Sequence, residues 1–160
     1  MAGNNRTDME RLLEQLRRDE GAVRDPEGRH KAYRCPAGKL TIGYGHNLDA
    51  NPVPGLREES LISEEEARAL LERDVVRVRG QLVNALPWTG VLDFPRFAVL
   101  VNMAFNMGIG GLCGFRNTLE DVKRGDFSGA ARRMRASKWA FQVKSRAERL
   151  IGQMETGQWH

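Results

Sequence analysis

The chain has 160 residues, the length of one domain with a substantial buried core. Hydrophobic residues make up 41% and charged residues 29%, so we expect a soluble globular fold rather than a disordered chain. The net charge of +4 favours a polyanionic partner, whether nucleic acid, anionic lipid or the acidic bacterial wall, without choosing among them.

The first predicted element is a helix that ends near Glu20. Its apolar residues recur at helical spacing: Met9, Leu12, Leu13 and Leu16. Residues 7–10 read TDME, the form of a capping box, and Gly21 suits the position just past the helix end. Residues 22–31 are polar and irregular, and the DPEG at 25–28 favours a turn.

A β-hairpin is predicted over residues 33–46. The PAGK at 36–39 supplies its turn, and apolar residues then alternate with small or polar ones: Leu40, Ile42 and Tyr44. Residues 47–61 contain two prolines and a glycine, so we expect a loop there.

The second half of the chain is predicted to be helical. The SEEE at 63–66 forms a second capping box, which opens a helix to about Val83. The run 97–107 is apolar almost all round, which is typical of a buried central helix, and glycines at 108, 110 and 111 should end it. Shorter helices are expected near 116–124, 127–136 and 145–155, the last capped by Ser145.

This order of elements predicts an α+β fold, because strands are followed by a run of helices. We expect a single domain over 1–160, with a small β-containing N-terminal lobe and first helix at 1–62, a linking helix at 63–84 and a helical lobe at 85–160. A cleft between two such lobes is a natural ligand site.

Several classes of protein are disfavoured by what the sequence lacks. Two cysteines, Cys35 and Cys113, do not make a disulfide framework, and free thiols are the expectation. Three histidines and two cysteines show no metal-ligand spacing. No stretch approaches the length of a transmembrane helix, and residues 1–8 lack the apolar core of a signal peptide.

Several ordered motifs resemble a known family. A helix ending in DEG at 19–21 is followed by AYRCPAGKLTIGYGH at 32–46, and further matches are NMAFNMG at 102–108, GFRNTL at 114–119, SKW at 137–139 and TGQW at 156–159. Together they resemble the T-even type of phage lysozymes, endolysins that cut the glycan strands of bacterial peptidoglycan. The resemblance spans roughly residues 9–159.

The resemblance implies a catalytic set of Glu20, Cys35 and Thr41. Glycoside hydrolysis needs a protonated acid beside the leaving oxygen, and inverting enzymes need a base that activates water. Glu20 suits the acid, because the negative pole at the C-terminal end of a helix disfavours a charged carboxylate. Family members carry Asp or Cys where Cys35 stands, and the Thr41 hydroxyl can orient the attacking water.

One spacing departs from the family pattern. Fourteen residues separate Glu20 from Cys35, more than is usual, whereas the five between Cys35 and Thr41 match. The added residues enlarge the loop around 25–30, so a carboxylate of that loop is an alternative base. We rank Cys35 first and Asp25 second.

The resemblance also implies residues that contact the substrate or hold the fold. The predicted substrate contacts are Gly45, Leu48, Phe105, Thr118, Arg133 and Lys138. His46 is expected to pair with Asp74 in a structural ion pair. The rival interpretation is a Cys35–His46 dyad, which would make the protein a cysteine endopeptidase acting on peptide stems.

The predicted function is therefore a muramidase that hydrolyses β-1,4 bonds between N-acetylmuramic acid and N-acetylglucosamine. The alternatives are a lytic transglycosylase, the cysteine endopeptidase, or a non-catalytic wall-binding protein. We expect a monomer that acts on peptidoglycan, with no cofactor, no metal, no nucleic-acid partner and no stable membrane association. It should stay in the host cytoplasm until a separate factor releases it to the wall.

Overall fold

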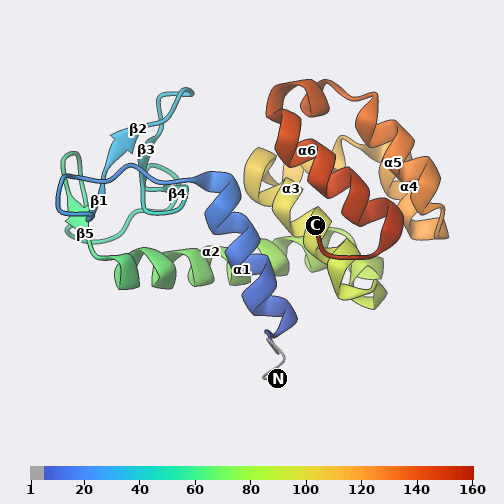
Figure 1. Ribbon diagram of the computed structural model, residues 1–160, viewed down its shortest axis with the longest axis horizontal. Coiled ribbons are helices and arrows are strands. Elements are labelled where there is room, and N and C mark those ends of the chain that lie inside the picture. Colours follow the sequence, from blue (N-terminus) through green and yellow to red (C-terminus); the bar gives the residue numbers. More distant parts are fainter. Residues whose placement is uncertain (1–5) are drawn as a thin grey trace. The chain divides into compact units, whose positions relative to one another are not determined.

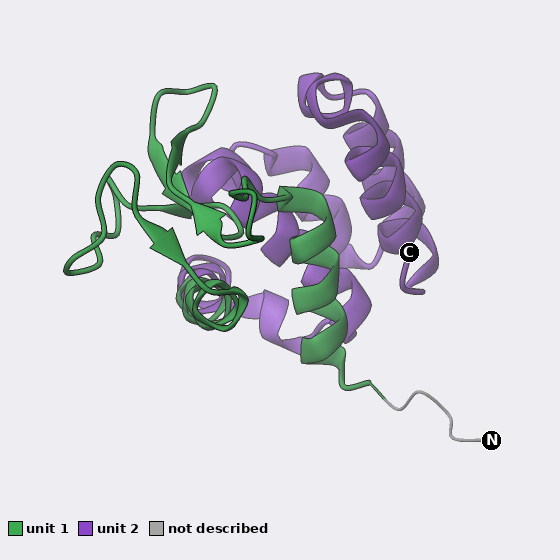
Figure 2. Ribbon diagram, turned by 60° about the vertical axis from the view of Figure 1, so that its left-hand side comes forward, with its two compact units in different colours: residues 1–77 green, residues 78–160 purple. Residues whose placement is uncertain are grey.

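The computed structural model describes residues 6–160 and has the predicted α+β fold, with helices and two small antiparallel sheets (Figure 1). The chain divides into two compact units, unit 1 ending at Arg77 and unit 2 running from Val78 to His160 (Figure 2). Unit 1 holds the first helix and both sheets, and unit 2 holds the later helices.

Helix α1 (Asp8–Glu20) opens with the predicted capping box. Thr7 Oγ1 accepts the Glu10 N–H at 3.2 Å, and the Glu10 carboxylate accepts the Thr7 N–H at 2.7 Å. The predicted apolar face is buried, since Leu12 and Leu16 have no exposed surface. The helix ends at Glu20, because Gly21 leaves helical geometry with a φ of 64° that glycine adopts without strain.

Two sheets follow in unit 1. The strands are β1 His30–Lys31, β2 Tyr33–Arg34, β3 Leu40–Ile42, β4 His46–Asn47 and β5 Leu61–Ile62. The predicted hairpin region forms a sheet in the order β2-β3-β4, with Tyr33 opposite Thr41 and Ile42 opposite His46. The second sheet, β1 with β5, was not predicted. Segments expected to be irregular therefore meet as strands.

Helix α2 (Glu64–Ala85) begins with the second predicted capping box. Ser63 Oγ accepts the Glu66 N–H at 3.1 Å, and the Ser63 N–H donates to the Glu66 carboxylate at 3.2 Å. The helix contributes residues to both units, because the division between them falls at Arg77.

The four α-helices that the sequence predicts beyond residue 85 are present in unit 2, and a 3₁₀ helix that was not predicted precedes them. They are η1 Pro87–Val91, a 3₁₀ turn, followed by α3 Phe94–Cys113, α4 Arg116–Arg124, α5 Phe127–Arg135 and α6 Lys138–Thr156. The stretch of α3 from Phe97 to Ala104 is buried, which confirms the predicted central helix.

Two predicted helix ends were wrong. Gly108 (φ 79°, ψ 159°) interrupts α3 without ending it, and the helix resumes as far as Cys113. The last helix begins at Lys138, where the Ser137 side chain accepts the Ala140 N–H at 3.3 Å. Its kink at Lys144 (φ 39°) lies just before the predicted start at Ser145. In both helices a local backbone break was mistaken for a helix terminus.

Helix α3 also corrects one expectation about length. It has the length and apolar composition of a membrane span, with a mean hydropathy of 1.3, although no such stretch was predicted. Half of that window is buried inside the structure, as in the core helix of a globular domain.

Candidate active site

Glu20 is the last residue of α1, and its carboxylate lies against the turn that leads from β3 to β4. A Cβ added to Gly45 would stand 2.9 Å from Glu20 Oε2, closer than such atoms approach in proteins. The missing side chain at Gly45 therefore makes room for the carboxylate. This contact lies within unit 1 and brings two of the predicted site residues together.

Cys35 and Thr41 are brought together by the β2–β3 pairing. Tyr33 faces Thr41 across the sheet, and Cys35, two residues further on, continues the ladder because its N–H donates to the Lys39 carbonyl at 3.0 Å. Side chains two apart on an extended strand share a face. Tyr33, Cys35 and Thr41 therefore lie on one face, with the Thr41 hydroxyl close enough to hydrogen-bond the Cys35 thiol.

The surroundings of Cys35 favour its ionised form. The Lys39 backbone N–H lowers the pKa of the thiol most, and the Ala37 N–H and the Thr41 hydroxyl lower it further, outweighing a partial loss of water that acts to raise it. Cys35 is half-buried, and neither Cys35 nor Cys113 forms a disulfide bond. A thiol with these donors around it holds more thiolate at neutral pH than an ordinary cysteine.

Tyr33 is a site residue that the sequence reasoning missed. Burial raises the pKa of its phenol, and the negative charges of Glu20 and Cys35 raise it further. Tyr33 therefore stays protonated at neutral pH, and it shares a face of the sheet with Thr41 and Cys35. Its position two residues before Cys35, in a predicted strand, was the signal that could have placed it on this face.

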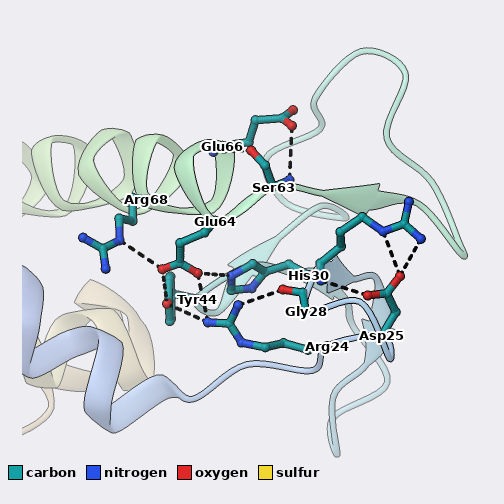
Figure 3. Close-up of polar contacts among 10 residues, drawn as sticks. Arg24, Asp25, Gly28, His30, Tyr44, Ser63, Glu64, Glu66 and Arg68 are labelled. Atoms are coloured by element: carbon teal, nitrogen blue, oxygen red, sulfur yellow. Dashed lines mark hydrogen bonds and ion pairs between the residues drawn. The ribbon is translucent and has the colours of Figure 1, made fainter.

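Asp25, the alternative base, is engaged by its own loop (Figure 3). Its carboxylate accepts the Arg29 side chain at 2.7 and 2.8 Å and the backbone N–H groups of Glu27 and Arg29 at 3.0 and 2.8 Å. Partial loss of water acts to raise the pKa of Asp25, yet the bonds from Arg29 lower it overall. A carboxylate held in this way is a weak base.

His46 and Asp74 form a buried pair. His46 Nδ1 lies 2.7 Å from Asp74 Oδ2, and the two side chains are 6% and 5% exposed. His46 Nε2 lies 2.8 Å from the Asn51 carbonyl oxygen, so both ring nitrogens face acceptors. Burial acts to lower the pKa of His46, but Asp74 and the Asn51 carbonyl raise it overall. No ring nitrogen is left to take a proton from Cys35, which argues against the dyad.

The remaining predicted substrate contacts are spread over both units. Leu48 is buried in unit 1. In unit 2, Thr118 and Arg133 line one pocket of about 490 Å³, where Arg133 Nε donates to Asp121 Oδ2 at 2.6 Å. Phe105 is half-buried on α3, and Lys138 is exposed at the start of α6. Contact of these side chains with sugar stays a prediction.

No metal centre is apparent in the part of the chain that the structure describes. Within residues 6–160, no group of three or more His, Cys, Asp or Glu side chains is placed to hold a metal ion.

Comparison with known proteins identifies the family. The family model for phage lysozyme matches residues 24–154. The chain is 32% identical to the pre-baseplate central spike protein Gp5 of Enterobacteria phage T4, over 91% of this chain and 28% of that protein. It is 27% identical to probable T4-type lysozyme 1 of Dictyostelium discoideum, over 91% of this chain and 94% of the relative. It is 31% identical to an endolysin of Acyrthosiphon pisum secondary endosymbiont phage 1, over 64% of each chain.

These relatives differ in length. The chain spans just over a quarter of the spike protein and nearly all of the Dictyostelium protein. The predicted family is confirmed by a match that covers most of the sequence. The chain belongs to the phage lysozyme family of muramidase-type peptidoglycan hydrolases.

Proposed function

We propose that this protein hydrolyses the β-1,4 bonds between N-acetylmuramic acid and N-acetylglucosamine in peptidoglycan, with Glu20 as the general acid. The contact between the Glu20 carboxylate and Gly45 carries this proposal. It sets a carboxyl group beside the segment that follows Cys35 and Thr41. The family match begins at residue 24, beyond Glu20, so the role of Glu20 rests on the resemblance of the motifs around it, and the contact with Gly45 supports that role.

In the proposed reaction Glu20 donates its proton to the glycosidic oxygen, and the bond from that oxygen to the anomeric carbon breaks. Water attacks the anomeric carbon, and Cys35 accepts the proton that the water loses. The Thr41 hydroxyl has one proton, which points to the Lys39 carbonyl at 3.0 Å and turns to the sulfur when Cys35 is a thiolate. In either orientation its oxygen lone pairs can accept a hydrogen bond from the water. The thiolate is available because the surrounding donors lower the pKa of Cys35.

The test is a product analysis on purified peptidoglycan. A hydrolase leaves reducing sugar ends that carry an oxygen from water, and digestion in H₂¹⁸O adds two mass units to each new end. A lytic transglycosylase leaves an anhydro end without label, and an endopeptidase leaves intact glycan with cut stems. Labelled N-acetylmuramic acid ends are the expected result, and either other product would overturn the proposal.

A non-catalytic wall-binding protein is separated by the same digestion, because it would release no fragments while still sedimenting with the wall. We propose that the substrate is the wall of a bacterial host and that a separate factor delivers the enzyme to it. If this route is correct, added protein should lyse cells whose outer membrane has been permeabilised and should leave intact cells unlysed.

A further inference from the structure

Glu64, the first residue of α2, is the centre of a polar cluster in unit 1 that the sequence did not reveal (Figure 3). We call it the Glu64 cluster; its members are Arg24, His30, Tyr44, Glu64 and Arg68. Glu64 Oε1 accepts the Tyr44 hydroxyl at 2.5 Å and Arg68 Nε at 3.0 Å. Glu64 Oε2 accepts Arg24 at 2.9 Å and faces His30 Nε2 at 2.7 Å.

The cluster is held together by charge. Partial burial acts to raise the pKa of Glu64, but the bonds from His30, Tyr44, Arg68 and Arg24 lower it well below its ordinary value. Glu64 is therefore anionic at every pH at which lysis would be measured. Burial and the bond to Glu64 raise the pKa of Tyr44, so its hydroxyl stays a donor.

Tyr44 stands between two glycines with left-handed backbones, Gly43 at φ 62° and Gly45 at φ 76°. Glycine has more conformational freedom to lose than any other residue, so a turn of this kind needs an anchor. Tyr44 is that anchor, because its ring is buried edge-on to His30, with the ring centroids 4.9 Å apart, and its hydroxyl is fixed by Glu64.

The same cluster holds the chain that follows Glu20. Arg24 lies three residues past Gly21, and its guanidinium donates to the Tyr44 hydroxyl at 3.1 Å as well as to Glu64. Arg24 also donates to the Gly28 carbonyl at 3.0 Å. The Glu64 cluster thus ties together the segment after the Glu20 carboxylate and the turn that contains Gly45.

We propose that Glu64 is a positioning residue for the reaction: it ties Tyr44 and Arg24 to the start of α2 and so holds Gly45 and Glu20 in contact. The inference rests on the proposed function, since it takes Glu20 as the acid. Misplacement of a catalytic group by about 1 Å can cost on the order of a hundredfold in rate. The cluster therefore acts mainly on kcat, with a smaller effect on substrate binding through Gly45.

Two variants test the inference. Tyr44→Phe removes only the hydroxyl that joins the glycine turn to Glu64 and keeps the buried ring. Glu64→Gln keeps the size of the side chain and removes its charge. Each should lower kcat by on the order of tenfold with a smaller change in KM, because the acid loses its alignment while Gly45 is the one predicted sugar contact on the loosened turn. Both are assayed below their unfolding temperatures, and Tyr44→Phe is the decisive variant if Glu64→Gln fails to fold.

Glu65→Gln is the matched control, because Glu65 is exposed in the same first turn of α2 and carries the same charge near the helix N-terminus. It should leave kcat at the wild-type value. Glu64→Asp should recover part of the lost kcat, because a shorter carboxylate can still accept the hydroxyl. Folded Tyr44→Phe with wild-type kcat would overturn the inference, and so would an equal loss in Glu65→Gln.

The failure of this inference can be told from failure of the proposed function. If Glu20→Gln remains active, the assignment of Glu20 as the acid is wrong, and the positioning role of Glu64 is then wrong as well. If Glu20→Gln is inactive while Tyr44→Phe and Glu64→Gln both keep full kcat, only the positioning role is wrong.

Discussion

His46 lies in strand β4 of the three-stranded sheet, and Cys35 directly follows strand β2 of the same sheet. The two side chains differ in burial and in how many of their polar atoms already have partners. His46 is buried, and both of its ring nitrogens are taken, by Asp74 and by the Asn51 carbonyl. Cys35 is half-buried and surrounded by donors that favour its thiolate. A titratable group whose partners are complete stabilises the fold, whereas an accessible one with stabilised charge is free to react.

The largest effect expected from this comparison is the loss of Cys35. Cys35→Ala should lower the rate of lysis by on the order of a hundredfold or more, since a general base contributes about that much. Cys35→Asp should restore substantial activity, because a carboxylate can take the same proton. Turbidity clearing of permeabilised cells measures both, and full activity in Cys35→Ala would remove the thiol from the mechanism.

Thr41→Val keeps the shape of the side chain and removes the hydroxyl. We expect lysis to fall roughly fivefold to tenfold, which corresponds to one hydrogen bond. The pKa of Cys35 should also rise, because the thiolate loses a donor. The rate of iodoacetamide alkylation against pH would then have its midpoint at higher pH than in wild type. An unchanged midpoint would show that Thr41 does not donate to the thiolate.

His46→Asn should affect stability and leave kcat little changed. Breaking a buried ion pair costs about 3 kcal/mol of the free energy of unfolding. The pKa of His46 is raised in the fold, so the stabilisation is full below the unfolded-state pKa of about 6.5 and is lost as pH rises through the folded-state pKa.

Thermal unfolding between about pH 5 and about pH 8 checks this dependence. The difference between wild type and His46→Asn should shrink toward the alkaline end, and the exposed His160→Asn serves as a control. A difference that stays constant with pH would mean that the pair is not charged.

The smallest effect is expected at Asp25. Its carboxylate is tied to Arg29, so Asp25→Asn should leave the rate of lysis within about twofold of wild type. A loss as large as that of Cys35→Ala, measured in the same assay, would transfer the role of the base to the loop.

Most helices were predictable because their signals are local. The capping boxes at Thr7 and Ser63 lie within four residues of sequence, and α4 has the predicted bounds. The β1–β5 pairing and the Glu64 cluster were not predictable, because their partners are far apart in sequence: His30 and Glu64 are 34 positions apart. No periodicity encodes such a contact.

The candidate site divides in the same way. The sequence motifs that resemble the family were enough to predict the catalytic set of Glu20, Cys35 and Thr41. The contact of Gly45 with Glu20 needed the fold, since it depends on how a helix end and a turn pack together. The placement of Tyr33 beside Cys35 could have been read from the alternation of the predicted strand. The engagement of Asp25 by Arg29 also needed side-chain geometry, because the sequence shows only two charges four residues apart.

The most direct test of the account is the rate of lysis by Glu20→Gln. Glutamine keeps the size of the side chain beside Gly45 but cannot donate an acidic proton to the glycosidic oxygen. Clearing of permeabilised cells should slow by on the order of a hundredfold to ten-thousandfold, with the unfolding temperature close to that of wild type. Residual activity above roughly a tenth of wild type in folded Glu20→Gln would contradict the assignment of Glu20 as the acid.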